Sequence, residues 1–255
     1  MKYLLAPLLL IAFLGASQQT LAGKAPAGMV EVPAGVYKLF YKEKDQKDAV
    51  SISGFYIDKY PVTNKDYLEF VKKNPRWRKS EAPAIFAAGG YLQHWLGDLE
   101  VPAGQGKRPV IFVSWFAAKR YCEFHGKRLL TVNEWEYASD GGSPEQMEKI
   151  LGWYGKPNEA LGEIDKSSAN KFGVRDMHGL VWEWVEDYAS VIVKADSRSD
   201  NNSEGKLFCG GGALGAASTE EYTTFMRFAF RSSLQGNYVT GNLGFRCGKD
   251  LKNET

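Results

Sequence analysis

The chain has 255 residues, of which 44% are hydrophobic and 24% are charged, and its formal net charge at pH 7 is +2. These values are ordinary for a globular protein. Such a small net charge argues against a general nucleic-acid-binding protein, because those proteins carry a concentrated basic face. Aromatic residues make up 13% of the chain, which is ample material for a sizeable core, and 27 glycines indicate a fold with many turns.

Residues 1–22 are typical of an export signal. Lys2 supplies the positive start, residues 4–14 form the apolar run, and residues 20–22 (TLA) fit a cleavage site of small residues. No cysteine follows that site directly, so a lipoprotein anchor is not expected, and no later segment reaches about 18 apolar residues. We therefore expect a periplasmic or secreted protein without membrane insertion after cleavage. An uncleaved N-terminal anchor is the alternative.

Strands are predicted near the start of the mature chain, and a helix follows them. Residues 29–37 are typical of a strand, with a turn at residues 33–35. Apolar and polar residues alternate over residues 50–56, which predicts a second strand. Thr63 and Asp66 have the spacing of a helix capping box, so we expect a helix between Thr63 and Asn74.

The middle of the chain is expected to be irregular at first and then helical. Residues 76–109 show no steady period, yet they carry many large aromatic side chains, so we expect them to be packed. Ser114 has the character of a helix cap, with the helix running to residue 125. Thr131 and Glu134 predict a third capped helix, which Gly141 and Gly142 would end.

From residue 169 onward the chain is rich in glycine and aromatic residues, and we expect short strands there. No internal repeat and no composition shift marks a boundary. We therefore predict that residues 23–255 form one mixed α+β domain.

The positions of the cysteines and histidines leave the disulfide pairing open and do not predict a metal site. An exported chain favours disulfides, but Cys122, Cys209 and Cys247 allow three different pairings and leave one thiol over. The three histidines lie at positions 94, 125 and 178 without metal-ligand spacing, so we expect each to be a structural or surface residue.

Residues 173–187 (GVRDMHGLVWEWVED) form the most informative stretch. Asp176 and Glu183 are seven residues apart, with a glycine turn between them. A chain that folds back at this turn brings both carboxylates and nearby backbone carbonyls around one hard cation, the usual way of holding calcium. The alternative is an aromatic core strand with solvated acids.

Five segments in order resemble the formylglycine-generating enzyme family, also called the sulfatase-modifying factor family. They are FYIDKYPVTNKDYLEF (55–70), PVIFVSW (109–115), YCEFHGKRLLTVNEWEYAS (121–139), NKFGVRDMHGLVWEWVED (170–187) and GNLGFRCG (241–248). The resemblance covers nearly all of the mature chain. It implies a single compact α+β domain that is low in regular secondary structure and distantly like the C-type lectin fold.

The resemblance also implies a disulfide and a calcium site. The YC and GFRC motifs place Cys122 and Cys247 where some members form a disulfide, which would leave Cys209 as a free thiol; three reduced thiols are the alternative. Members bind structural calcium at the segment that here supplies the side chains of Asp176 and Glu183 and the carbonyls of Gly179 and Val181.

The catalytic cysteines of the family are missing. Matching Arg227 and Arg231 to the family's two arginines places Gly215 and Thr223 where active members have redox cysteines, and no cysteine lies between residues 210 and 238. Those members bind copper through the two thiolates, as soft sulfur ligands suit Cu(I). We therefore expect no copper and no thiol oxidation by this chain.

Two functions remain. In the first, the protein is a non-catalytic accessory or regulatory factor that binds a protein or peptide partner, as in the TagR-type periplasmic regulators of type VI secretion signalling. The expected contact residues are Ala213, Leu214, Gly215, Glu220, Glu221 and Tyr222, unless this stretch is a plain surface loop. The alternative is a metal-dependent periplasmic oxidoreductase, which would need histidine and carboxylate ligands, and no histidine lies between residues 210 and 245.

Overall fold

The computed structural model describes residues 25–39, 47–140, 144–156, 160–189 and 219–251. The strands are β1 (Met29–Val32), β2 (Gly35–Lys38), β3 (Ala49–Ile52), β4 (Phe55–Asp58), β5 (Arg128–Leu129), β6 (Trp182–Trp184), β7 (Leu243–Phe245) and β8 (Cys247–Asp250). The helices are α1 (Asn64–Lys73), the short 3-10 helix η1 (Pro75–Trp77), α2 (Trp115–Phe124), α3 (Val132–Ser139), α4 (Pro144–Tyr154) and α8 (Thr219–Ser232). The predicted export signal and Cys209 lie outside the described residues.

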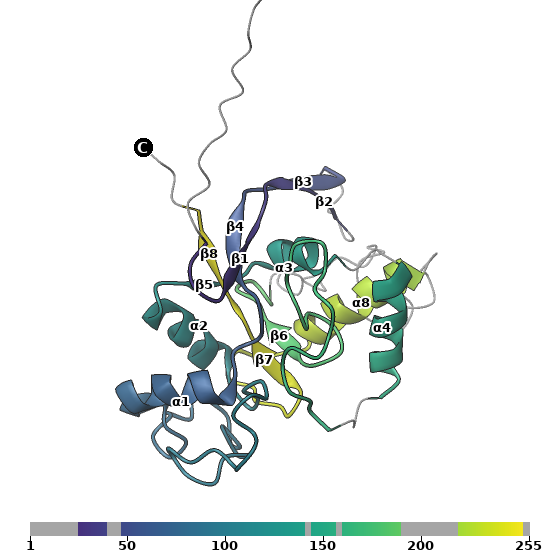
Figure 1. The fold of residues 1–255 in the computed structure, drawn as a ribbon. Helices are drawn as coiled ribbons and strands as arrows, with labels where there is room; N and C mark the ends of the chain where they lie inside the picture. The colour runs from purple at the N-terminus through teal and green to yellow at the C-terminus, as the bar shows by residue number, and fades with distance from the viewer. Residues whose placement is uncertain (1–24, 40–46, 141–143, 157–159, 190–218, 252–255) are drawn as a thin grey trace, which may run out of the picture.

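The strands form one larger sheet and two small ones. The larger sheet has the order β1-β4-β8-β5 and is antiparallel; it joins strands from the start (β1, β4), the middle (β5) and the end (β8) of the chain. β2 and β3 form a hairpin, and β6 pairs with β7 in parallel. In Figure 1, α1 and α2 lie on one side of these strands, and α4 and α8 lie on the other side. The described elements confirm the predicted mixed α+β domain with short elements.

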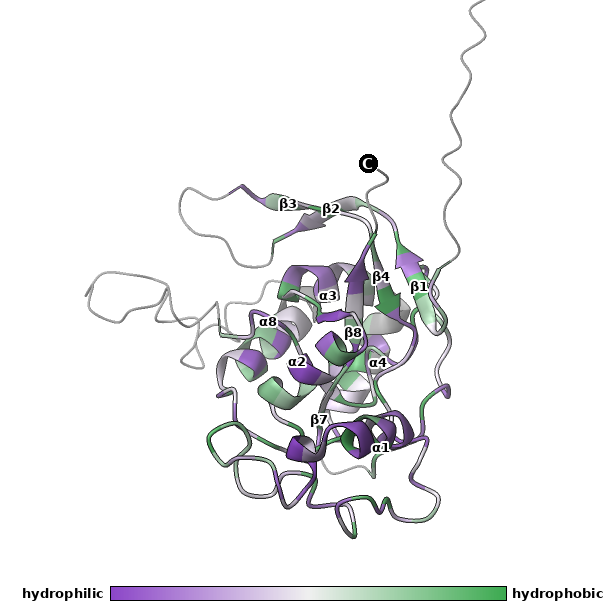
Figure 2. Cartoon of the chain, turned by 90° about the vertical axis from the view of Figure 1, so that its left-hand side faces the viewer, coloured by the Kyte–Doolittle hydropathy of each residue, from purple (hydrophilic) through white to green (hydrophobic). Residues whose placement is uncertain are grey.

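The structure contains the three helix caps predicted from the sequence. The hydroxyl of Thr63 accepts a hydrogen bond from the Asp66 backbone, and Thr131 does the same for Glu134, with both reciprocal bonds formed. Ser114 accepts from the backbone of Ala117 and begins α2. Because each cap satisfies backbone N–H groups that a helix start leaves unpaired, local sequence was enough to place these three starts. Figure 2 shows α1 as a mainly hydrophilic helix; its apolar residues Tyr67 and Phe70 are buried.

Other predicted elements were wrong in extent or type. Residues 29–37 form two strands of different sheets, β1 and β2, and residues 50–56 are divided between β3 and β4. Helices α4 and α8 were not predicted. In α8, threonine and aromatic residues have modest helix propensity, yet the helix buries a stripe that includes Thr224, Phe228 and Arg231. Tertiary packing therefore decides the structure of this segment.

The core confirms two further expectations. The irregular residues 76–109 are packed, with Trp77, Tyr91 and Trp95 all buried. Cys122 and Cys247 form the predicted disulfide, with 5.6 Å between their Cα atoms, and it ties α2 to β8 inside the core. None of the helices in the described part of the chain has the length and apolar composition needed to cross a membrane.

Candidate functional site

The parallel pair β6–β7 positions the first charged group of the site. Glu183 lies opposite Gly244 in the register of the two strands. A Cβ atom at Gly244 would lie 2.7 Å from the Val110 carbonyl oxygen, so only glycine permits this close backbone approach. The pairing brings Glu183 near Arg246, which immediately precedes β8.

Glu183 and Arg246 form a fully buried ion pair, with 2% and 1% exposure. The Nη2 atom of Arg246 lies 2.8 Å from Oε1 of Glu183, and its Nε lies 2.9 Å from Oε2. The remaining guanidinium donors bond the carbonyls of Asp58, Lys59 and Arg175. Every group of this pair is therefore satisfied, which is what makes a buried charge tolerable.

A second buried ion cluster joins α3 to α8. Glu136 accepts from Nη2 of Arg227 at 2.7 Å and from Nη1 of Arg231 at 2.7 Å. Arg227 also donates to the hydroxyl of Thr224 at 3.0 Å. One carboxylate thus faces two guanidinium groups, so the cluster carries an excess positive charge. Within the described residues, Nη1 of Arg227 and Nε of Arg231 have no hydrogen-bond partner.

Trp135 lies between the two clusters. Its indole Nε1 donates to Oε2 of Glu183 at 2.7 Å, while the Arg231 guanidinium lies over the indole ring at 4.4 Å. The ring of His178 meets the same indole edge-on at 5.5 Å. One rigid side chain therefore fixes the spacing between both buried ion pairs.

The titratable groups around α8 are not tuned for proton transfer near neutral pH. Burial favours a raised pKa for Glu136, but Arg227 and Arg231 outweigh it and hold its pKa below the ordinary value. Burial lowers the pKa of His178 to about 3 and raises the pKa of Tyr154 to about 12. A general acid or base works best with a pKa near the working pH, and none of these three groups has one.

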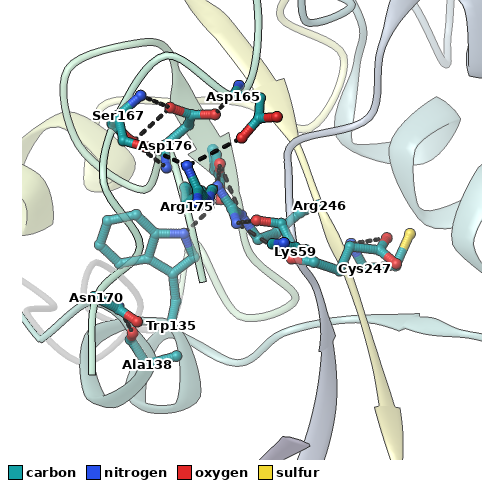
Figure 3. Close-up of polar contacts among 12 residues, drawn as sticks. Lys59, Trp135, Ala138, Asp165, Ser167, Asn170, Arg175, Asp176, Arg246 and Cys247 are labelled. Carbon is teal, nitrogen blue, oxygen red and sulfur yellow. Dashed lines mark hydrogen bonds and ion pairs between the residues drawn. The ribbon is translucent and has the colours of Figure 1, made fainter. Parts of the chain in front are cut away.

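The proposed calcium ligands Asp176 and Glu183 have separate protein partners. Asp176 accepts from the backbone of Asp165 at 2.7 Å and from the hydroxyl of Ser167 at 2.7 Å, as Figure 3 shows. Glu183 is held by Arg246 and Trp135. The glycine turn is present, since Gly179 has a φ of 89°. Because both carboxylates already accept several protein donors, this arrangement argues against a bound calcium ion, and the site that the family resemblance implies at Asp176, Gly179, Val181 and Glu183 is untested.

The positions of the family's catalytic cysteines are only partly described. Gly215 lies outside the described residues, as do Ala213 and Leu214. Thr223 lies in α8 and is fully buried, with its hydroxyl 3.3 Å from the sulfur of Met147. The predicted binding stretch therefore ends in a helix rather than a loop: Glu220 and Glu221 lie on α8, and Tyr222 is half-buried near its start.

The histidines are dispersed, as predicted. Nε2 of His94 bonds Oδ1 of Asn64 at 2.9 Å, His125 is exposed at the end of α2, and His178 packs on Trp135. The part of the chain that the structure describes has no group of three or more histidine, cysteine, aspartate or glutamate residues able to hold a metal ion.

Sequence reasoning missed most of the buried ionic framework. Arg227 and Arg231 were used only to align the chain with the family, and Glu136, Trp135 and Arg246 were not assigned a role. The available signal was an acidic residue, Glu136, beside Trp135 on the helix face that also carries Val132. Its arginine partners lie more than 90 positions along the chain, so spacing alone did not connect them.

Comparison with known proteins gives the class of the molecule. The family model described as "Sulfatase-modifying factor enzyme 1-like domain" matches residues 16–251. The chain belongs to this family, which confirms the resemblance carried by the five motifs. A formylglycine-generating enzyme of Mus musculus is 27% identical, with 87% of this chain and 75% of the relative covered. A Bos taurus protein named inactive C-alpha-formylglycine-generating enzyme 2 is 28% identical, with 95% of each covered.

Further similarities are to part of a longer protein and to two solved structures. The chain matches about a third (34%) of the serine/threonine-protein kinase pkn1 of Chlamydia caviae, at 29% identity. Among solved structures, PvdO from Pseudomonas aeruginosa is 20% identical with a TM-score of 0.48, covering 88% of this chain and 94% of that one. CarF is 16% identical with a TM-score of 0.49, covering 89% and 99%.

Proposed function

We propose that this chain is an exported, non-catalytic member of the sulfatase-modifying factor family that binds a protein partner as an accessory or regulatory factor. A secretion or enzyme-maturation system in the periplasm is the setting we propose for that partner. Among the relatives, one that is named inactive supports a member of this family that works without the chemistry.

The identity and burial of Thr223 are the main support for this proposal. Its side chain replaces a family thiol and lies at 0% exposure against Met147 of α4. Its carbonyl accepts a hydrogen bond from the Tyr154 hydroxyl at 3.1 Å, which further fixes α4 over α8. A reactive group at this position would lie in packed core, where a peptide substrate does not reach it.

The cysteine inventory supports the same conclusion. Cys122 and Cys247 are joined in a disulfide, so Cys209 is the remaining thiol of the chain. Thiolate-based copper chemistry in this family uses two cysteines, and one free thiol does not supply that ligand set.

The partner surface that we propose is the start of α8 with the stretch that precedes it. It comprises Ala213, Leu214, Gly215, Glu220, Glu221 and Tyr222. Small residues there would let a partner backbone approach closely, and the two acids would favour a basic segment.

Site-specific photo-crosslinking tests this proposal. A photoreactive amino acid at Tyr222, in the full chain produced in its own cells, is expected to capture one dominant protein. The matched control carries the same amino acid at Val36, which is 67% exposed on the β2–β3 hairpin. Equal capture at both positions would contradict the proposal that the start of α8 binds the partner. Absence of capture, together with metal-dependent oxygen uptake by the purified protein, would instead favour the oxidoreductase.

A further inference from the structure

A groove of about 630 Å³ lies between the C-terminal end of α1 and the side of α2. We call it the α1–α2 groove; its lining includes Lys73, Arg76, Trp77, Phe86, Phe116 and Arg120. Its lining residues come from α1, η1, α2 and the residues that connect them. Figure 1 shows α1 and α2 on one side of the strands and α8 on the other. It is therefore separate from the α8 surface proposed above.

The floor of the groove is a connected row of aromatic rings. The ring centroids of Trp77 and Phe86 lie 6.4 Å apart, and those of Phe86 and Phe116 lie 5.2 Å apart in an edge-to-face arrangement. Trp77 is buried and anchors the row to the core, while Phe86 and Phe116 are half-buried. The rings thus offer a firm apolar surface that is still open to solvent.

Cations flank this floor on both walls. Lys73 and Arg76 come from the end of α1 and from η1, and the Arg76 guanidinium lies over the Phe86 ring at 5.4 Å. Lys119 and Arg120 come from α2. The four cations face a single lining carboxylate among the described residues, Glu123.

The cations of the α1 wall are the ones left for a ligand. Lys119 is paired with Glu186, and Arg120 lies 3.5 Å from Glu123 in an exposed pair. In the described ranges, neither Lys73 nor Arg76 forms an ion pair with a carboxylate. Two cations without an ion-pair partner in the described ranges, beside a half-buried aromatic ring, attract an anionic group that also has an apolar part.

We propose that the α1–α2 groove binds an acidic segment of a partner protein, in which a large apolar side chain packs on Phe86 and Phe116. Carboxylates beside that side chain pair with Lys73 and Arg76, the two cations of the α1 wall. The volume lies within the roughly 300–1,000 Å³ range of ligand sites, and cations on two walls match an extended segment better than a single small anion. The inference rests on the proposed function only in assigning the segment to a partner protein.

Direct binding of a synthetic peptide tests the groove without the partner. The probe is a short fluorescent peptide of glutamates interrupted by phenylalanine, titrated against the full chain by anisotropy. Binding is expected to weaken strongly at about 0.5 M salt, because the exposed charges are then screened. The Lys73→Glu/Arg76→Glu double variant should lose at least about tenfold in affinity, since each reversal opposes a peptide carboxylate.

The matched control is Lys38→Glu/Lys65→Glu, which makes the same change in net charge at two exposed positions outside the groove lining. It should bind the peptide within about twofold of the parent chain. Peptides with lysine in place of glutamate, or serine in place of phenylalanine, should bind at least about tenfold more weakly.

Three outcomes would overturn the inference. The first is that the acidic peptide does not bind. The second is that the groove variant and the control variant lose the same affinity for the peptide. The third is that a short oligothymidylate binds tightly while the peptide does not. A partner still captured through Tyr222 but unaffected by Lys73→Glu/Arg76→Glu would reject the groove and leave the proposed function standing. Peptide binding at the groove, with no partner captured through Tyr222, would reject the proposed α8 partner surface and leave the groove standing.

Discussion

Trp135 donates its indole N–H to the buried carboxylate of Glu183 at 2.7 Å. The same ring carries the guanidinium of Arg231 on its face, so one side chain of α3 connects the strand pair β6–β7 with helix α8. Three segments that are distant in sequence therefore depend on one aromatic residue. This framework explains how a chain with short strands and many turns holds a defined core.

Removing the indole donor should destabilise the protein. For Trp135→Phe we expect a loss of about 1.5–3 kcal/mol in the free energy of unfolding, because a hydrogen bond to a buried charged group is lost. Chemical denaturation with fluorescence detection measures it. The control is Trp115→Phe, whose indole donates to the neutral Val185 carbonyl at 2.9 Å and should cost less, about 0.5–1.5 kcal/mol. Equal losses in the two variants would contradict the special position of Trp135.

Breaking the ion pair should cost more than removing the hydrogen bond. Arg246→Met leaves Glu183 buried without a counter-ion, and we expect a loss of about 3–5 kcal/mol in the free energy of unfolding. Adding Glu183→Gln to this variant removes the unpaired charge and should recover part of that loss. No recovery in the double variant would show that the charge itself is not the cause.

Reducing the disulfide should weaken the fold. Cys122 and Cys247 are separated by 125 positions, so their bond restricts a long stretch of the unfolded chain. We expect the Cys122→Ala/Cys247→Ala variant to lose about 2–5 kcal/mol of stability. Cys209→Ala is the control and should change little if that thiol is free. Peptide mapping of the non-reduced protein should show the Cys122–Cys247 pair, and mapping that finds both thiols free would rule out the bond.

His94 should make stability depend on pH. Its Nε2 must donate to the Asn64 side-chain oxygen, which leaves Nδ1 buried and, within the described part of the chain, without a partner. Burial, aided by Lys79, lowers the pKa of His94 to about 4, whereas an unfolded histidine titrates near 6.5. The unfolded state therefore binds the proton first, and stability falls as pH drops from about 6.5 to about 4.

The His94→Gln variant isolates this contribution. Glutamine keeps a donor for Asn64 but does not titrate, so the fall in stability between about pH 6.5 and 4 should be shallower than in the parent chain. The difference in slope is at most about 1.4 kcal/mol per pH unit for one group. Denaturation midpoints measured across this range give the comparison, and parallel slopes for the two proteins would exclude a role for His94.

Calcium provides a separate test of the turn at Gly179. Because Asp176 and Glu183 are already satisfied by protein donors, we expect neither calcium nor a chelator to shift the melting temperature. If calcium did bind, a calcium concentration of about 100 times the Kd would add about 2.7 kcal/mol to the free energy of unfolding. A calcium-dependent rise that disappears in Asp176→Ala would contradict this expectation and establish the four-ligand site that the family resemblance implies.

Local sequence predicted those parts of the fold that local chemistry controls. Helices α1, α2 and α3 begin at Thr63, Ser114 and Thr131 because each hydroxyl caps the next turn, and that signal is contained in four consecutive residues. Helix α8 carries no comparable signal. Its helical state follows from packing against α3 and α4, which periodicity over threonine and phenylalanine residues does not reveal.

The site was less predictable than the fold. The family motifs located Cys122, Cys247 and Glu183, but not the partners that Glu183 uses. Arg246 was visible only as part of a motif, although it makes contacts with Asp58 and Arg175 far away in the chain. A buried charge is selected by its partners in space, so its role is readable only once the strands β6, β7 and β8 are placed.

The loss of thiol chemistry is tested most directly by oxygen uptake from the copper-loaded full chain with a cysteine-containing peptide. The formylglycine-generating enzyme of Mus musculus serves as the positive control. We predict uptake no faster than the copper-only blank, both for this chain and for Gly215→Cys/Thr223→Cys, because Thr223 is packed against Met147. Peptide-dependent uptake by the unaltered chain, with conversion of the peptide cysteine, would contradict a non-catalytic role for this protein.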